Sequence, residues 1–358
     1  MLSGDRLFFI DPHERYFLYQ GDRTSGYLWH LTERRSELQR IPDQFAPFSD
    51  NICGSTKDVL AAGCYPGTLF RFPLRCSASE LSQVTYSHER LEALLSQFES
   101  DARLLLIFLK SVERLEVSVR DEHSTDADVR FTVRLTDGCR DSVRRSRRCI
   151  VDAVRNSSVE SVSTTYLLVI ETLKYGVDES VEKETYRYWV NEFFAGGKTS
   201  KVLTELRDDP SVSRIPLVGT AIDLDGGSST DVKLSSAVPA KDESVEEDPK
   251  RAPSGKIFCF LPLAVQEVSA TGLPVHVNGY FAISQNRQHL KWPSVGQSVE
   301  SDKCLLWNHC LIVELIPRSY RDLLASATRS QLFTADDVYA AIPNVVEVDE
   351  KWQVRTFT

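Results

Sequence analysis

Two stretches of alternating apolar and polar residues constrain the fold of this chain most. The apolar positions are Leu115, Val117 and Val119 in the first stretch, and Phe131, Val133 and Leu135 in the second. Successive side chains of a strand point to opposite faces, so this alternation is typical of strands with one buried and one wet face. These two stretches are therefore predicted to be half-buried strands, each with one wet face.

Further elements are predicted along the chain from apolar runs, caps and turn residues. Strands are predicted at residues 7–10, at 16–19 after an Asp11-Pro12 turn, at 68–74, in LLLIFLK from Leu104, at 162–173, from Ile257, and on both sides of an Asn278-Gly279 turn within 273–283. Helices are predicted after an N-cap at Ser87, at 182–194 with an end at Gly196-Gly197, at 305–327, and after a cap near Thr334. Residues 20–67 are predicted to be rich in loops. The pattern indicates a mixed α/β (α+β) protein.

Composition places the chain among ordinary globular proteins. Its 358 residues are 42% hydrophobic and 26% charged, and the formal net charge is −9, which argues against a general nucleic-acid binder. Eight cysteines contain no Cys-x-x-Cys pair, so a zinc ribbon is not expected. No secretory signal and no run of membrane-spanning length is present. These features favour a cytoplasmic protein with reduced thiols, and they give no sign of a membrane partner.

The composition changes sharply at about residues 223–255. This stretch is acidic, rich in Pro and Ser, and free of aromatic residues. Such a segment cannot bury enough apolar area to offset the entropy of ordering it, which predicts a disordered insertion.

Several motifs suggest chemistry, and each has a simpler interpretation. AGGKTS at Ala195 resembles the end of a phosphate-binding loop, but Glu192 stands where that motif needs glycine, so a helix C-cap is expected. DLDGGSST at Asp223 lacks the distant glutamate of a calcium loop. His276 and His309 are not spaced as metal ligands. No catalytic residue and no metal site are therefore assigned.

A cluster of arginines raises one further possibility. Arg140, Arg144 and Arg148 would share one face of a helix, and Arg147 lies beside them. A basic helical face can bind phosphates, nucleic acid or an acidic protein, although a solvated face is the commoner outcome.

Six sequence blocks, spread over nearly the whole chain, resemble the repeat unit of the sacsin family. In chain order they are GDRLFFIDPHERYF from Gly4, GTLFRFPLR from Gly67, LLLIFLK from Leu104, KIFCFLPLAV from Lys256, GLPVHVNGYFAIS from Gly272 and WNHCLIVELIPRSY from Trp307, with a helix before LLLIFLK. That repeat is similar to the amino-terminal and middle domains of ninety-kilodalton heat-shock chaperones. The resemblance implies that residues 1–80 are a remnant of a two-layer GHKL-type ATP-binding domain, and that residues 81–358 are a middle-type α/β domain.

The resemblance also implies where a nucleotide would bind. The acidic-Asn helix, the Asp-x-Gly-x-Gly turn and the glycine-rich lid that hold ATP and Mg²⁺ in that family have no counterpart here. They would precede Leu7, and the chain starts almost directly in a strand-like run, as a fragment does. Thr68 matches a Gly-Thr pair near the adenine, while Arg287 and Lys291 are basic loop residues that could reach a phosphate. A Gln follows Arg287 where relatives often carry a second arginine.

Three functions follow from this reading. The first is a chaperone or co-chaperone module that binds client proteins and other chaperones, with no cofactor and no catalysis of its own. The second is part of an ATPase whose pocket lies upstream of Met1, with Thr68, Arg287 and Lys291 near the nucleotide. The third is a binder of phosphate polymers or nucleic acid that uses the arginines from Arg140 to Arg148.

Overall fold

The structure is a computed structural model that divides the chain into two compact units. Unit 1 comprises Met1–Ser96 and Ser118–Val129, and unit 2 comprises Gln97–Val117 and Arg130–Thr358. The residues that the structure describes are 1–10, 26–38, 59–72, 74–78, 82–120, 127–156, 160–176, 178, 180–197, 201–212, 214–225, 255–263, 271–344, 346, 348–349 and 351–352.

Unit 1 is built on a four-stranded antiparallel sheet. Its strand order is β3 (Gly26–His30), β2 (Arg6–Ile10), β1 (Leu2–Gly4) and β4 (Tyr65–Leu69), and the short helices α1 (Arg35–Leu38) and α3 (Val59–Ala62) belong to the same unit. The turn between β1 and β2 needs a positive φ at Gly4 (+56°), which glycine adopts without strain. The core of the unit contains the buried residues Leu2, Trp29, Leu31, Leu38, Val59 and Tyr65.

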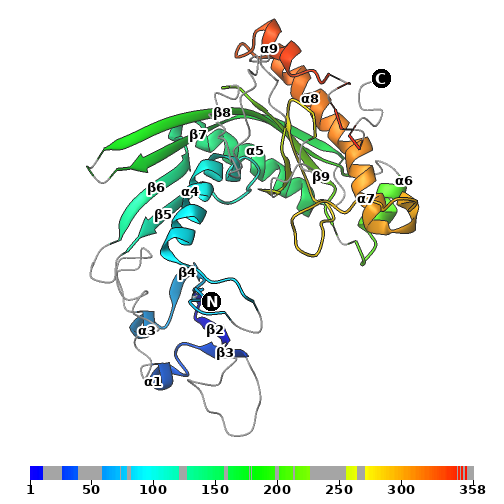
Figure 1. Cartoon of the computed structure of the whole chain (residues 1–358). Helices are drawn as coiled ribbons and strands as arrows, with labels where there is room; N and C mark the ends of the chain where they lie inside the picture. The colour runs from blue at the N-terminus through cyan, green and yellow to red at the C-terminus, as the bar shows by residue number, and fades with distance from the viewer. Residues whose placement is uncertain are drawn as a thin grey trace, which may run out of the picture. The chain divides into compact units, whose positions relative to one another are not determined.

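Unit 2 is built on an eight-stranded sheet (Figure 1). The strands, in spatial order, are β11 (Leu261–Pro262), β10 (Ile257–Cys259), β12 (His276–Gly279), β9 (Leu217–Asp223), β8 (Val181–Phe194), β7 (Val162–Tyr175), β6 (Asp128–Leu135) and β5 (Arg114–Val119). The pairs with recorded register are antiparallel except β10–β12, which is parallel. β7 and β8 form the longest ladder, in which Val162 pairs with Phe194 and Tyr175 pairs with Val181.

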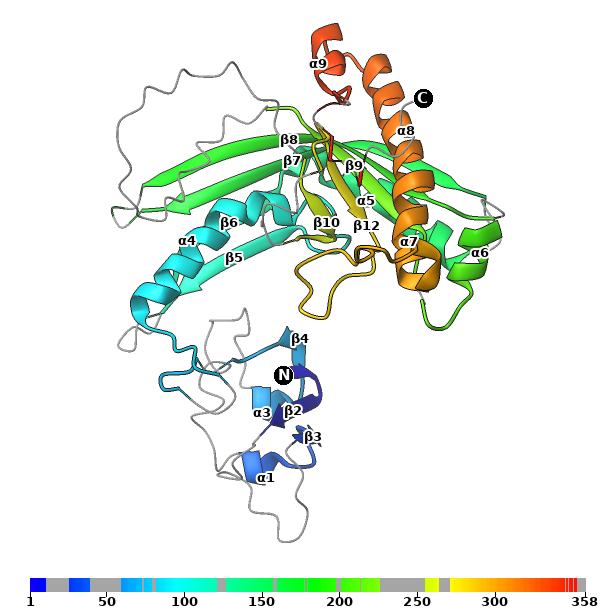
Figure 2. The ribbon, with the colours of Figure 1, turned by 45° about the vertical axis from the view of Figure 1, so that its right-hand side comes forward.

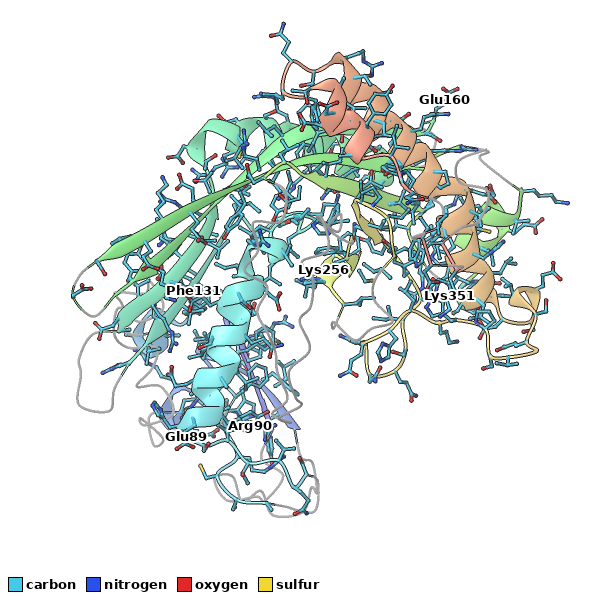
Figure 3. All side chains as sticks on the ribbon, turned by 45° about the horizontal axis from the view of Figure 1, so that its top comes forward. Glu89, Arg90, Phe131, Glu160, Lys256 and Lys351 are labelled. Atoms are coloured by element: carbon cyan, nitrogen blue, oxygen red, sulfur yellow. The ribbon has the colours of Figure 1, made fainter. Side chains whose placement is uncertain are left out.

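Helices cover both faces of this sheet (Figure 2). α5 (Asp137–Arg155) and the end of α4 (His88–Leu105) pack on one face. On the other face lie α6 (Lys201–Arg207), α7 (Lys303–Cys310), a π-helical turn at Leu311–Leu315 and α8 (Ile316–Arg329). The one-turn helix Val299–Ser301 precedes α7 in the chain, and α9 (Ala335–Ala340) follows α8. Phe131 of β6 packs against Phe98 of α4, with ring centroids 5.8 Å apart (Figure 3). This arrangement confirms the predicted α+β class.

A neutral hydrogen-bond network fixes α8 on its face of the sheet. The Asn191 amide of β8 donates to the hydroxyls of Ser163 (3.0 Å) and Thr165 (2.9 Å) on β7. The Ser319 hydroxyl of α8 donates to the Asn191 amide oxygen (2.8 Å) and lies 2.9 Å from the Thr220 hydroxyl. Buried polar groups are costly unless they are paired, so this network sets the register of α8 on the sheet.

Several predicted elements are confirmed. The strands at 7–10, 115–119, 131–135 and 162–173 are β2, β5, β6 and β7. The Ser87 hydroxyl accepts from the amide of Arg90 at the start of α4, and Thr334 forms a capping box with Asp337 at the start of α9. Residues 303–329 are helical throughout.

The helix predicted at 182–194 is wrong, because Val181–Phe194 is strand β8. Its even-numbered residues from Tyr188 onward face α5, and its odd-numbered residues from Trp189 onward face α8. Gly196-Gly197 therefore follows a strand, and the expected helix C-cap does not exist. A phosphate-binding loop also starts after a strand, but Glu192 still occupies the position of its first glycine.

Other predicted boundaries also need correction. LLLIFLK is not a strand, because α4 continues to Leu105 and a buried turn follows it. Asn278-Gly279 is not a turn: both residues pair within β12, opposite Gly219 and Val218. The strand predicted at 68–74 is β4, which ends at Leu69, and the segment 20–67 contains β3, α1 and α3. The predicted Asp11-Pro12 turn, the predicted strand at 16–19 and residues 226–254 of the predicted insertion lie outside the described residues.

Candidate protein-binding surface

The three residues predicted near a nucleotide have different surroundings. The Thr68 hydroxyl, on β4 of unit 1, lies 2.8 Å from the Ser3 hydroxyl. In unit 2, Arg287 occupies a tight turn with a positive φ of 58°, and its side chain is exposed. The Lys291 ammonium donates to Asp302 Oδ2 (2.9 Å), and this hydrogen bond raises the pKa of Lys291. Arg287 is therefore the freer cation of the two.

The register of the unit 1 sheet sorts its side chains into two faces. One face carries the row Leu69, Leu2, Leu7 and Trp29, in which each residue pairs with the next, and this row packs into the core. The opposite face carries Phe8 paired with Leu28, and Phe8 and Met1 exchange two backbone hydrogen bonds. The β1–β4 register, continued by one residue, places Phe70 beside Met1.

A row of four side chains therefore crosses the sheet, in the order Phe70, Met1, Phe8 and Leu28. We call it the open-face row. All four side chains are exposed, and Leu28 has 59% of its surface accessible. Beyond the row, Phe72 is 77% exposed and its ring stacks parallel to that of Phe70 at a centroid distance of 6.0 Å. Single exposed apolar residues are common on proteins, whereas a contiguous set marks an interaction site.

A polar row borders the open-face row on the same face of the sheet. It consists of Thr68, Ser3, Arg6 and His30, which are paired successively by the strand register. Asp5 lies in the adjoining turn, 3.0 Å from His30 Nδ1, and the hydrogen bond with His30 lowers the pKa of Asp5. Thr68 thus belongs to the same surface as the exposed aromatic residues.

Unit 2 contains a buried charged cluster on the α5 face of its sheet. The Lys110 ammonium contacts Glu192 Oε1, and Glu192 is almost fully buried between Thr164 of β7 and Gly219 of β9. The Arg147 guanidinium, on a residue only 3% exposed, donates through Nη2 to the carbonyl oxygens of Leu106 (2.9 Å) and Ile107 (3.3 Å). The ring of Phe108 helps to seal this site. It packs closely on Gly219, where an added Cβ would lie only 3.0 Å from the ring.

The charges of this cluster act on the neighbouring side chains. Burial lowers the pKa of Lys110, and Glu192 opposes this effect. Burial raises the pKa of Tyr166, and the charge of Glu192 raises it further. Among the described residues, Arg147 Nε and Nη1 and Glu192 Oε2 have no hydrogen-bond partner. The arrangement joins the turn after α4 to the sheet and to α5, so it has a structural role.

Arg140, Arg144 and Arg148 share one side of α5 as predicted, but ion pairs neutralise the first two. Arg144 forms a bidentate ion pair with Glu113 at 2.7 Å, Arg140 contacts Glu113 and Asp137, and Arg147 is buried. Sequence reasoning missed the burial of Arg147, although the residue lies four positions after Val143 and three before Ile150, both of which are buried. Arg145 and Arg148 remain exposed, which leaves a small basic surface.

Neither of the described histidines singled out from the sequence has a partner set for a metal. His276 is half-buried, its ring packs against Tyr188 and Phe258, and its Nδ1 accepts from the amide of Lys256. Burial lowers the pKa of His276 to about 3. His309 is exposed beside buried Cys310. Within the described residues, no three His, Cys, Asp or Glu side chains are grouped closely enough to hold a metal ion.

None of the helices in the described part of the chain has the length and hydrophobicity needed to cross a membrane.

Comparison with known proteins gives two matches to one family. The family model described as "Sacsin domain" matches residues 1–132, which include all of unit 1 and hence the open-face row. Sacsin of Homo sapiens is 32% identical over 370 aligned residues, which cover 99% of this chain and 7% of the human protein. The chain thus spans less than a tenth of that relative. The predicted resemblance to a sacsin repeat is thereby confirmed over nearly the whole of this chain.

Proposed function

We propose that this chain is a protein-binding module of a sacsin-like cytoplasmic protein, with a chaperone or co-chaperone role and no catalysis of its own. The observation that carries the proposal is the open-face row, in which Phe8, Leu28 and Phe70 are exposed side by side. Similarity to the sacsin family supports it further, since the family model covers this surface. Client proteins and other chaperones are the partners that this proposal implies.

The physical reason is the free energy of burying apolar surface. Complete burial of a leucine or phenylalanine side chain contributes about 1.5–3 kcal/mol. Several such residues held in one row by a sheet can bind an exposed apolar segment of another protein without first being ordered. The neighbouring Phe72 extends the same surface along the chain.

The test is suppression of aggregation. We expect the purified chain to reduce the light scattering of a thermally unfolding client enzyme, and the Leu28→Ser/Phe70→Ser variant to lose most of this effect. Both side chains are exposed and contribute little to the core, so the variant should keep its far-UV circular dichroism and its unfolding midpoint.

Val295→Ser is the matched control, because Val295 is a fully exposed apolar residue in unit 2. It should suppress aggregation as well as the parent chain does. Equal suppression by all three proteins, or no suppression by the parent chain, would contradict the proposal.

The alternative is a nucleotide-dependent role in a longer polypeptide. It is favoured by Thr68, which lies on the polar row of the same face. In this alternative, a segment upstream in the longer polypeptide would hold ATP and Mg²⁺, and the exposed Arg287 would be the residue that contacts the γ-phosphate. One arginine of this kind is worth about 10³-fold or more in phosphoryl transfer.

We therefore expect Arg287→Ala/Lys291→Ala to lower phosphate release by at least tenfold (one decade, a fraction of the arginine effect) in a polypeptide that contains the complete repeat. Lys201→Ala is the control, because its ammonium is far from this loop in sequence and its side chain is 90% exposed. Asp302 still caps α7 through the amide of Cys304 when Lys291 is removed, so the fold should persist. Unchanged phosphate release would exclude the role for both residues.

A further inference from the structure

A second exposed apolar surface lies in unit 2, around α9. Figures 1 and 2 both show α9 at the end of α8 that is farther from α7. Tyr339 is 72% exposed and Val346 is 88% exposed, and Leu332 and Ile342 are also largely exposed. The amide of Ile342 donates to the carbonyl of Tyr339 (3.0 Å), so these two side chains lie within one turn of each other. We call these four residues the α9 surface.

Neighbouring side chains anchor this segment firmly. Phe333, next to Leu332, packs against Trp189 of β8 with ring centroids 5.6 Å apart. Ala341, next to Ile342, is buried, and its carbonyl accepts from the Tyr320 hydroxyl of α8. Val348 is buried as well. The exposed side chains are therefore held outward by a folded segment, and the surface is preorganised for binding.

The segment that carries this surface is acidic, and the exposed Arg329 and Lys351 flank its two ends. Residues 331–349 contain four acidic residues, Asp336, Asp337, Glu347 and Asp349, and no lysine, arginine or histidine. Hydrogen bonds from Thr334 lower the pKa of Asp337, so this carboxylate stays ionised at neutral pH. Apolar side chains amid carboxylates attract a partner that presents apolar and basic side chains together.

We propose that the α9 surface docks an amphipathic basic helix of a partner protein. The apolar stripe of such a helix would cover Tyr339, Ile342 and Val346, and the lysines or arginines beside the stripe would face Asp336 and Asp337. Tyr339 is the expected anchor, because tyrosine is enriched among the residues that dominate binding energy. This surface is separate from the open-face row and does not depend on the function proposed for it.

The experiment uses fluorescein-labelled 18-residue peptides and the full chain, with binding measured by fluorescence anisotropy. One peptide has leucines at helical spacing with lysines elsewhere, a second has glutamates in place of lysines, and a third has the first composition with the leucines scrambled. We expect the first to bind at least tenfold more tightly than the other two, and its affinity to fall as salt is raised.

Variants then locate the site. Tyr339→Ser/Ile342→Ser should weaken binding at least tenfold, because truncation of an interface anchor typically costs more than fivefold per residue. Asp336→Asn should weaken it about threefold and flatten its salt dependence, as expected for one rim charge. Val295→Ser and Leu28→Ser/Phe70→Ser should bind normally, which separates this site from general attraction to an acidic chain and from the open-face row.

Two results would overturn the proposal. The first is equal affinity of the parent chain and Tyr339→Ser/Ile342→Ser for the leucine–lysine peptide, which would show diffuse charge attraction. The second is a dimer of the parent chain in sedimentation velocity that Tyr339→Ser/Ile342→Ser abolishes, which would show that a second copy covers the surface. An unfolding midpoint of the variant equal to that of the parent chain confirms that it is folded.

Discussion

Replacing Glu192 by alanine is expected to destabilise unit 2 by about 3–5 kcal/mol. The substitution removes the carboxylate that contacts Lys110. Two cations, the buried Arg147 and the largely buried Lys110, then remain without the negative charge of Glu192. Removing one partner of a buried ion pair costs far more than the pair contributes to stability, because the remaining charge stays desolvated. Urea unfolding followed by far-UV circular dichroism measures the change.

Two comparisons make this prediction specific. Glu116→Ala removes the partner of Arg114 on β5, but both side chains are more than a third exposed, so its cost should stay below about 1 kcal/mol. Glu192→Leu combined with Lys110→Met should be more stable than Glu192→Leu alone, since the unpaired ammonium is gone. A loss below about 1 kcal/mol for Glu192→Ala would mean that this cluster does not hold α4 and α5 to the sheet.

The second large effect is expected at Trp307 of α7. Its side chain is fully buried in the core between the sheet and the C-terminal helices, and its Nε1 donates to the carbonyl of Tyr280 (2.8 Å). Trp307→Ala should cost about 3–5 kcal/mol because it leaves a cavity, and the unpaired carbonyl adds about 1 kcal/mol or more.

The neighbouring His309 provides the control on the same helix. It is exposed, so His309→Ala should change the free energy of unfolding by less than about 0.5 kcal/mol. Chemical unfolding must be followed by circular dichroism, since Trp307→Ala also removes a fluorophore. If the two variants unfold at the same urea concentration, Trp307 does not occupy the closed core described here.

The sequence predicts elements whose pattern reflects local geometry. Alternation identifies β5, in which Leu115 and Val117 are half-buried between exposed neighbours, and β6, in which Phe131, Val133 and Leu135 are buried. The N-cap at Ser87 and the capping box at Thr334 mark the starts of α4 and α9. Strand β8 is not predicted correctly from the sequence, because its first half contains Glu182, Lys183 and Glu184, which are good helix formers. The ladders with β7 and β9 make this segment a strand.

Buried segments are ambiguous for a different reason. LLLIFLK is surrounded by protein, so its apolar run has no period that separates strand from helix or turn. Asn278-Gly279 is a frequent turn pair, yet here the Asn278 amide oxygen accepts from the amide of Phe260 and stabilises a strand. These outcomes depend on contacts between residues that are distant in sequence.

The candidate surface could be predicted only in part. Phe70 and Phe72 were within a recognised block, and Thr68 was singled out, but the open-face row depends on pairing across β1 and β3, neither of which was predicted. The alternation of Tyr27 and Trp29 with exposed residues was the available signal for β3. Likewise, the spacing of Val143, Arg147 and Ile150 was the signal for the buried arginine.

The hydrogen bond from Ser319 to Asn191 joins residues that leave the ribosome 128 positions apart. While the chain is being made, the Asn191 amide oxygen can have only water as its partner on that face, because α8 has not yet been synthesised. Closing so long a loop is slow, so β7 and β8 must wait in a half-covered state. The α8 face of β7 and β8 therefore stays uncovered by α8 until residue 319 has been synthesised.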